Sequence, residues 1–342
     1  MRNISILGCG RWASFHAWYQ SEKLGNRVQM WGRTGDPIFE NIVANHGNDY
    51  VKLSDSVEYT DCLVDALKFS THQFISISAQ AMPEFSRNIA KALDRIKRTE
   101  RGGFKMSQSR HVFVLCMKGI HAKNGRRLSE ILRTELDKAG HTNTQICVWV
   151  GPGHTEELTR GKPNAMIMDG EDAKTTADVI KMCSSDLIRL YQGDDMLGVE
   201  IGGAAKNVIG IAAGMLDGAG MTSLKGALMA RGFYEVSNLI VAMGGKRLTA
   251  YGLSLLGDSE ATIFSAISSN RNYGENFITG KESTRLAEGV DTSIAMHKLG
   301  KQHKVDMPIT NLVYRALHKG DNPMELFAKM FQGRTNRREF GE

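Results

Sequence analysis

The chain has 342 residues, 42% of them hydrophobic and 23% charged, which is the composition of an ordinary soluble globular protein. This length exceeds the usual size of a single hydrophobic core and therefore predicts two domains. The formal net charge of +6 permits an anionic ligand. A nucleic-acid partner is not expected, because no aromatic residues interleave with the basic runs and no recognition motif accompanies them.

The five cysteines form no C-x-x-C pair and no metal-ligand spacing with histidine, and their odd number argues against a disulfide framework. We therefore expect a reducing cytoplasm and no metal site. The N-terminus goes straight into Ile4–Leu7 without a charged leader, so export is not indicated. No apolar run approaches the length of about 18 residues that a membrane span needs.

The first half of the chain alternates strand patterns with helix patterns. The predicted strands are Asn3–Leu7, Arg27–Trp31, Gln73–Ile77, His111–Cys116, Thr144–Trp149 and Ala165–Met168. The predicted helices are Trp12–Lys23, Asp61–Lys68 and Met82–Ile96. Such alternation predicts a parallel sheet with helices on both faces. The polar residues 97–110 are expected to form a solvated insertion.

The pattern changes to helices from Asp194 onward. The predicted helical windows are 199–215, 226–243, 284–303 and 324–331. The fold class is therefore an α/β doubly wound domain of the Rossmann type followed by an all-α domain, with boundaries at 1–190 and 191–342. Dehydrogenases commonly have this plan, with the active site between the two domains. The basic tail at 334–338 is expected to be a solvated terminus.

A glycine-rich turn, Gly8-Cys-Gly10-Arg-Trp-Ala13, stands after the first strand and opens the first helix. Gly8 allows the tight turn, Gly10 lets a pyrophosphate approach the backbone, and Ala13 permits close packing of helix on sheet. The alternative is a simple strand-to-helix turn. The position of the glycine turn after the first strand, with a second strand at the right distance, favours dinucleotide binding.

The second strand ends in Trp31-Gly32-Arg33, where an acidic residue would grip the ribose hydroxyls of NAD. No carboxylate is offered there. Arg33 is suited to a 2′-phosphate, which favours NADP, although an arginine stacked on the adenine fits either cofactor.

Lys206 stands inside an apolar run of small residues, Val199–Gly218. A buried lysine tends to have a lowered pKa, which suits it to pass a proton to or from a substrate oxygen. The alternative is a lysine that extends from a packed helix to solvent.

Four other segments carry polar groups suited to an anionic substrate. They are Met117-Lys118-Gly119 after a strand, the turn Gly151–Glu157, Gly257-Asp258 with Thr262, and Asn270-Arg271-Asn272. Arginine with asparagine amides suits an oxyanion such as phosphate. Each segment taken singly is more often a surface feature.

Together and in order, these segments resemble the NAD(P)-dependent glycerol-3-phosphate dehydrogenases of bacterial type, from Ile6 to about Gly333. The resemblance also includes Ser78-Ala-Gln80, Glu288-Gly289 and Met307-Pro-Ile-Thr310. It implies that Lys206 is the general acid/base at the C2 oxygen, that Lys118 orients the same centre, and that Asp258 is the third catalytic residue.

The resemblance also implies two sets of binding residues. The substrate set is Lys118, Gly151, Gly153, Lys206, Asn207, Asp258, Thr262, Asn270, Arg271 and Asn272, with Arg271 and Asn272 on the phosphate side. The cofactor set for NADP or NAD is Gly8, Gly10, Arg11, Trp12, Ala13, Arg33, Lys118, Thr155, Arg271 and Glu288.

The chain departs from the family pattern at several places. Ala13, Ser78, Gly153 and Thr155 stand where the family usually has Gly, Pro, Ser and Ala. The turn at 219–224 and the segment 259–269 are also atypical. Since the two lysines, Asp258 and the Arg-Asn pair persist, these changes bear on substrate detail and cofactor preference more than on the reaction.

The predicted function is interconversion of sn-glycerol 3-phosphate and dihydroxyacetone phosphate with NAD(P)H, feeding glycerophospholipid synthesis. One alternative is a related two-domain dehydrogenase for another small anionic keto or hydroxy substrate. Another is a dinucleotide sensor without catalysis, which the loss of Lys118, Lys206 or Asp258 would have favoured. A homodimer is the expected assembly.

Overall fold

The structure is a computed structural model, and it describes residues 1–99, 109–283 and 285–331. Most of the predicted insertion at 97–110 and the whole tail at 334–338 lie outside the described residues. The chain divides by its internal contacts into two compact units. Residues 1–117 and 128–196 form the first, called the sheet unit here. Residues 118–127 and those from 197 onward form the second, called the helical unit.

The sheet unit contains an eight-stranded sheet in the order β3-β2-β1-β4-β5-β6-β7-β8. The strands are β1 (Asn3–Leu7), β2 (Arg27–Trp31), β3 (Glu58–Thr60), β4 (His72–Ile75), β5 (His111–Leu115), β6 (Thr144–Val150), β7 (Asn164–Gly170) and β8 (Ile188–Gln192). The strand order reverses between β1 and β4. Ligands bind at the carboxyl ends of the strands at such a point in doubly wound sheets.

Every neighbouring pair of strands is parallel except β6 and β7, which are antiparallel. The predicted parallel sheet is therefore confirmed apart from this pair. The connection between β6 and β7 contains only the four-residue helix α6 (Thr155–Leu158). A parallel crossover usually carries a full helix, so the chain returns beside β6 in the opposite direction.

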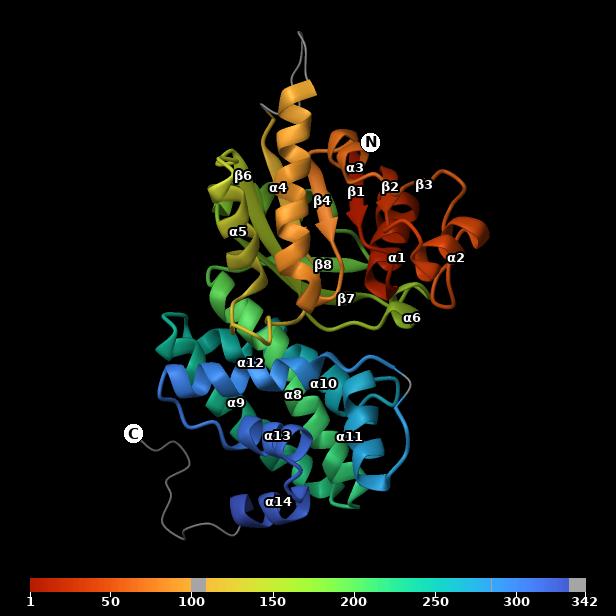
Figure 1. The fold of residues 1–342 in the computed structure, drawn as a ribbon. Coiled ribbons are helices and arrows are strands. Elements are labelled where there is room, and N and C mark those ends of the chain that lie inside the picture. Colours follow the sequence, from red (N-terminus) through yellow and green to blue (C-terminus); the bar gives the residue numbers. More distant parts are fainter. Residues whose placement is uncertain (100–108, 284, 332–342) are drawn as a thin grey trace. The chain divides into compact units, whose positions relative to one another are not determined.

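Helices cover both faces of the sheet, as predicted. Ile4 and Ile6 of β1 belong to one core cluster with Phe15 of α1 (Arg11–Trp18). Ser5 between them donates a 2.6 Å hydrogen bond to the carbonyl oxygen of Ala66 in α3 (Leu63–Phe69). Alternate residues of the strand thus serve opposite faces. Figure 1 shows α4 (Met82–Thr99) and α5 (Leu128–Lys138) side by side in front of the sheet.

Several elements of the sheet unit are not predicted by the sequence pattern. They are α2 (Pro37–Asn45), β3, α5, α7 (Ala173–Cys183) and β8. The predicted helix Trp12–Lys23 is α1 followed by one turn of π-helix at Tyr19–Lys23. Strand β3 has only three residues, none of them buried, so it carries no apolar alternation to detect.

The helical unit consists of helices and short turns in the part of the chain that the structure describes. Its helices are α8 (Met196–Gly218), α9 (Lys225–Ala242), α10 (Asp258–Ile263), α11 (Ser269–Thr279), α12 (Glu288–Gln302), α13 (Pro308–Lys319) and α14 (Pro323–Phe331). Figure 1 shows α8 running among the other helices. The four predicted helical windows correspond to α8, α9, α12 and α14, whereas α10, α11 and α13 were not predicted.

Helix α8 is apolar because it is the core of the helical unit. Among the described residues it is the one helix long and apolar enough to cross a membrane by these two criteria, and 83% of its most apolar window is buried. Its glycines permit close packing. A Cβ on Gly214 would lie 1.9 Å from the carbonyl oxygen of Arg271, and a Cβ on Gly274 would lie 2.0 Å from that of Ile211. The backbone of α11 therefore lies directly on α8.

Residues 118–127, called the strap here, follow β5 in the chain but belong to the helical unit. Ile120 is part of its hydrophobic core. Arg127 pairs with Glu200 of α8 at 2.7 Å, and the ammonium of Lys298 donates a 2.9 Å hydrogen bond to the carbonyl oxygen of Ala122. The strap thus attaches Lys118 to the helical unit.

Candidate active site

Two lysines of the helical unit share one buried carboxylate. The Nζ of Lys118 lies 2.7 Å from Oδ2 of Asp258, and the Nζ of Lys206 lies 3.3 Å from Oδ1. Only 3% of the Asp258 side chain is exposed, against 11% and 12% for the two lysines. The structure therefore brings together the three residues that the resemblance implies are catalytic.

Local structure fixes this cluster. Asp258 is the first residue of α10, which continues directly from a π-helical turn at Leu253–Gly257. Thr262, one turn later, donates a 2.7 Å hydrogen bond to the carbonyl oxygen of Asp258 and accepts a 2.9 Å hydrogen bond from Lys206. The Lys206 ammonium is thus held by two buried side chains.

Burial lowers the pKa of Lys206 below the ordinary lysine value, and the neighbouring charge of Lys118 lowers it further. The carboxylates of Asp258 and Glu288 act in the opposite direction without cancelling these effects. A lysine in this state exchanges its proton more readily near neutral pH, as a general acid or base requires.

A chain of buried amides lies beside the lysines. Asn207 donates a 2.9 Å hydrogen bond to the carbonyl oxygen of Lys118 and accepts one of 2.9 Å from Asn270. Asn270 in turn accepts a 2.9 Å hydrogen bond from the backbone of Gly289, at the start of α12. These bonds tie the strap, α8, α11 and α12 together around the cluster.

Glu288, the first residue of α12, is a further member of this cluster of polar side chains. Its Oε2 accepts a 3.5 Å hydrogen bond from Asn207. Burial raises the pKa of Glu288, whereas the charges of Lys206 and Lys118 oppose this rise. The resemblance implies that Glu288 lies near the cofactor, and in the structure Glu288 lies beside Asn207 and the two lysines.

Arg271 and Asn272 belong to a second polar cluster on α11. The Nε of Arg271 donates a 2.6 Å hydrogen bond to Oδ2 of Asp217, and its Nη2 lies 3.2 Å from a carboxylate oxygen of Glu275. Asn272 donates to the carbonyl oxygen of Ala266 at 2.9 Å. Asp217 was not predicted as a site residue, because nothing in the local sequence indicates its partner.

In the sheet unit, the Gly8–Ala13 turn has the geometry of a dinucleotide-binding loop. Gly8 has φ of +131°, and a Cβ on it would lie 2.1 Å from the carbonyl oxygen of Ser76. Gly10 is the N-cap residue of α1, a Cβ there would meet nothing within 4 Å, and the first turn of the helix carries no acidic residue. Ala13 is fully buried. The open helix N-terminus therefore suits a pyrophosphate.

Arg11 and Trp12 occupy the first turn of α1. The Arg11 guanidinium pairs with Glu156 and lies 4.8 Å from the ring centroid of Tyr50. The Trp12 ring packs edge-on against Phe15 at 5.2 Å. Both residues belong to the turn itself, and their contact with a cofactor stays a prediction.

The Arg33 side chain after β2 is 77% exposed, and its Nη2 lies 3.3 Å from a carboxylate oxygen of Asp36. A second carboxylate, that of Asp61 beyond β3, accepts a 3.0 Å hydrogen bond from Thr34. The end of β2 itself, Trp31-Gly32-Arg33, carries no carboxylate, as the sequence shows. Because β3 lies beside β2, the fold adds Asp61 to this region.

The turn between β6 and α6 contains the remaining predicted residues of the sheet unit. Gly151 and Gly153 pack against Met166 of β7, where a Cβ on either glycine would approach within 3 Å. Thr155 begins α6, and its buried hydroxyl has no hydrogen-bond partner among the described residues. A buried unpaired hydroxyl suits a ligand atom, so these residues and the glycine turn fit a dinucleotide.

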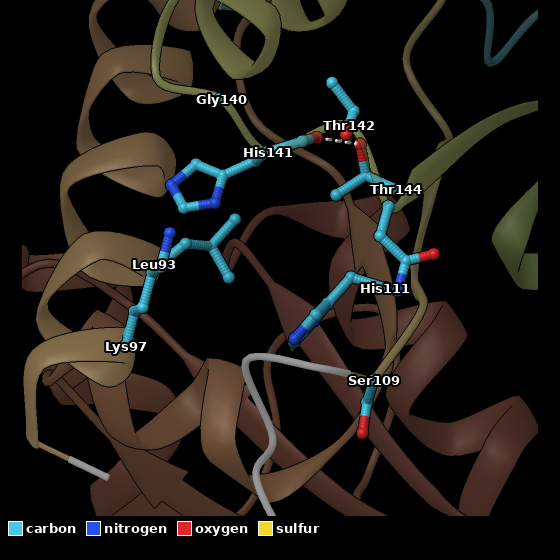
Figure 2. A pocket seen from close by; sticks show the side chains of 9 residues that line it. Leu93, Lys97, Ser109, His111, Gly140, His141, Thr142 and Thr144 are labelled. Atoms are coloured by element: carbon cyan, nitrogen blue, oxygen red, sulfur yellow. Dashed lines mark hydrogen bonds between the residues drawn. The ribbon is translucent and has the colours of Figure 1, made fainter.

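A pocket lies elsewhere in the sheet unit, at the amino ends of β5 and β6 (Figure 2). Lys97, His111 and His141 contribute to its lining, and the Nε2 of His141 lies 3.2 Å from a carboxylate oxygen of Asp94. None of the predicted site residues lines this pocket. Ligands of doubly wound sheets bind at the carboxyl ends, so this pocket is not the candidate site.

Comparisons with known proteins agree with this arrangement. Residues 3–176 match the family model for the N-terminus of NAD-dependent glycerol-3-phosphate dehydrogenase, and residues 195–328 match the model for its C-terminus. A protein of Thermoanaerobacter sp. (strain X514), named glycerol-3-phosphate dehydrogenase (NAD(P)+), is 31% identical over 332 residues, 94% of this chain and of that protein. One of the same name from Moorella thermoacetica is 32% identical over 99% of both chains.

The fold is also that of a solved structure. The crystal structure of glycerol-3-phosphate dehydrogenase from Coxiella burnetii has a TM-score of 0.85 and 26% identity, covering 97% of this chain and 99% of that one. Together with the matches to both halves of the family model, this shows that the chain belongs to the NAD-dependent glycerol-3-phosphate dehydrogenase family.

Proposed function

We propose that the chain interconverts sn-glycerol 3-phosphate and dihydroxyacetone phosphate by hydride transfer with NADPH or NADH. The observation that carries this proposal is the pair of lysines, Lys118 and Lys206, on the buried carboxylate of Asp258. Family membership and the names of the relatives support the same reaction. Its phosphorylated alcohol is a building block of glycerophospholipids.

Lys206 is the general acid and base at the C2 oxygen. In the reducing direction it donates its proton as negative charge develops on that oxygen, and in the oxidising direction it removes the hydroxyl proton. Lys118 stabilises the developing alkoxide electrostatically. Asp258 offsets one of the two positive charges and holds both ammonium groups in place.

The substrate phosphate is assigned to Arg271 and Asn272 on α11. A guanidinium binds a phosphate through parallel N–H groups, and a side-chain amide supplies a further donor. Glu275, which pairs with Arg271, is 40% exposed and is able to turn toward water when an anion binds.

The dinucleotide is assigned to the sheet unit, within residues 1–190, and the substrate residues mainly to residues 191–342. The backbone of the Gly8–Ala13 turn, Arg11 and the Thr155 hydroxyl would hold the dinucleotide. When bound, its nicotinamide supplies or accepts the hydride. All five cysteines lie among the described residues and are free, which supports a reducing cytoplasm. The helical unit exposes several large apolar side chains, Leu248 among them, and a homodimer that covers them is part of this proposal.

Oxidation of NADPH or NADH on addition of dihydroxyacetone phosphate tests the proposal. We expect turnover that depends on both the reduced cofactor and the phosphorylated ketone. A dinucleotide sensor would bind the cofactor without turnover. A dehydrogenase for another small anionic keto or hydroxy substrate would turn over that substrate faster than dihydroxyacetone phosphate.

A further inference from the structure

Asp217, in the last turn of α8, accepts hydrogen bonds from two cationic side chains of the helical unit. Its Oδ2 accepts hydrogen bonds from Nε of Arg271 at 2.6 Å and from Nζ of Lys225 at 3.0 Å. Its Oδ1 accepts a 3.1 Å hydrogen bond from the hydroxyl of Thr222. The Asp217 and Lys225 side chains are almost completely buried, at 7% and 5% exposed.

The two segments that depart from the family pattern meet at this carboxylate. Thr222 lies in the atypical turn 219–224, and Lys225 follows directly after it. The Lys225 ammonium also donates to the carbonyl oxygen of Ile263 at 3.3 Å and lies 4.9 Å from the ring centroid of Phe264. Both residues belong to the other atypical segment, 259–269. These two atypical segments therefore both lie around the Asp217–Arg271 pair.

Asp217 binds the Nε edge of Arg271, so a phosphate at the terminal nitrogens would replace only their longer contacts with Asn272 and Glu275. Asp217 binds the guanidinium through Nε, which fixes the plane of the group. The terminal nitrogens make longer contacts, with Nη1 3.2 Å from the side-chain oxygen of Asn272 and Nη2 3.2 Å from Glu275. A phosphate binds a guanidinium through two parallel N–H groups, and a guanidinium already fixed loses less conformational entropy when it binds.

Charge balance explains why Lys225 is present. A single buried carboxylate beside Arg271 would offset the charge that attracts a phosphate dianion. The buried ammonium of Lys225 compensates Asp217, so the partly exposed Glu275 is the remaining counter-charge of Arg271. Lys225 also ties Asp217 to α10 through the carbonyl oxygen of Ile263.

We propose that Asp217 is a positioning residue that orients Arg271 toward the substrate phosphate, with Lys225 compensating its charge. This inference rests on the proposed function, because it assigns the phosphate to Arg271. It goes beyond that function by adding two residues, outside the lysine cluster, that determine selectivity for a phosphorylated substrate over its unphosphorylated analogue.

The test compares Asp217→Asn, Arg271→Ala and the double variant, using dihydroxyacetone phosphate and unphosphorylated dihydroxyacetone as substrates. Asp217→Asn should raise KM for dihydroxyacetone phosphate by roughly 10- to 100-fold, the usual effect of a misplaced binding group. The kcat/KM for dihydroxyacetone should change by less than about threefold. In the Arg271→Ala background, Asp217→Asn should have no further effect on KM, since it acts only through Arg271.

Asp321→Asn is the matched control, because Asp321 also pairs with an arginine Nε, that of Arg315 at 2.5 Å, but on the exposed surface. The Asp321→Asn variant should have wild-type KM and kcat for both ketones. If Asp217→Asn does not fold, Lys225→Met tests the same proposal, with an expected rise of several-fold in KM for the phosphorylated ketone alone.

Three results would overturn the inference. They are equal losses on both ketones, full additivity of Asp217→Asn and Arg271→Ala, or unchanged KM values in the Asp217→Asn and Lys225→Met variants. Failure of the proposed function looks different, because the wild-type protein itself would then show no preference for the phosphorylated ketone.

Discussion

Lys118 lies 2.7 Å from Asp258, although Lys118 closely follows strand β5 in the chain and Asp258 begins helix α10. The strap carries Lys118 out of the sheet unit and fixes it to the helical unit. Three charged groups, Lys118, Asp258 and Lys206, therefore form one cluster within a single compact unit. This cluster is the basis of the proposed proton transfer.

The activity should depend on pH through Lys206. Burial lowers its pKa, so oxidation of glycerol 3-phosphate, which needs the neutral amine, should rise with pH through an apparent pKa below 10.5. Reduction of dihydroxyacetone phosphate needs the protonated form and should fall over the same range. The apparent value belongs to the coupled cluster of Lys206, Lys118 and Asp258. Profiles of kcat against pH in both directions measure it, and parallel profiles would contradict the assignment.

Arg271→Ala should raise KM for dihydroxyacetone phosphate far more than it affects turnover of unphosphorylated dihydroxyacetone. A charge-assisted hydrogen bond to phosphate is typically worth about 1.5–3 kcal/mol, which corresponds to roughly 10- to 100-fold in KM. Steady-state kinetics on the two ketones give the ratio. Equal losses on both would show that Arg271 does not bind the phosphate.

Arg33→Asp should shift kcat/KM toward NADH relative to NADPH by about tenfold, or about 1.4 kcal/mol, because it replaces an attraction for a 2′-phosphate with a repulsion. The wild-type protein should use NADPH at least as well as NADH. The carboxylates of Asp36 and Asp61 near Arg33 make this a demanding test. A strong wild-type preference for NADH, or an unchanged ratio in the variant, would reject the role of Arg33.

Glu235 of α9 should make the stability of the helical unit depend on pH. Its buried carboxylate accepts hydrogen bonds from the backbone of Ile309 and Thr310, and burial raises its pKa to about 7. Because the folded state favours the protonated form of Glu235, this residue stabilises the fold fully below the unfolded pKa of about 4.5. This stabilisation is lost as pH rises through the folded pKa of about 7.

Urea unfolding of wild type and Glu235→Gln at pH 5 and pH 8 measures this effect. The free energy of unfolding of wild type, relative to the variant, should be greater at pH 5 by roughly 1–3 kcal/mol. The same difference at both pH values would mean that Glu235 does not titrate in this range.

Local patterns were sufficient to predict the elements with strong signals. Strands β1 and β2 have the predicted bounds, because short apolar runs followed by turn residues distinguish them. The small-residue segment around Lys206 is likewise a long buried helix, α8. The glycine turn after β1 has the expected conformation at Gly8.

Tertiary relationships could not be predicted in the same way. The antiparallel direction of β7 depends on how the chain returns after Val150, and β3 is too short to carry a periodic signal. The partner of Arg271 depends on the close crossing of α8 and α11, which brings Asp217 beside a residue far away in the chain. Hydrophobic periodicity does not identify which helices meet.

The most direct test of the central claim is the kcat of Lys206→Met with dihydroxyacetone phosphate and a saturating reduced cofactor. Removal of a general acid should lower kcat by about 10²- to 10⁴-fold. The cofactor Kd should remain near that of wild type, and circular dichroism should confirm that the variant is folded. A folded Lys206→Met variant that keeps near-wild-type kcat would contradict the account, because proton transfer would then not depend on Lys206.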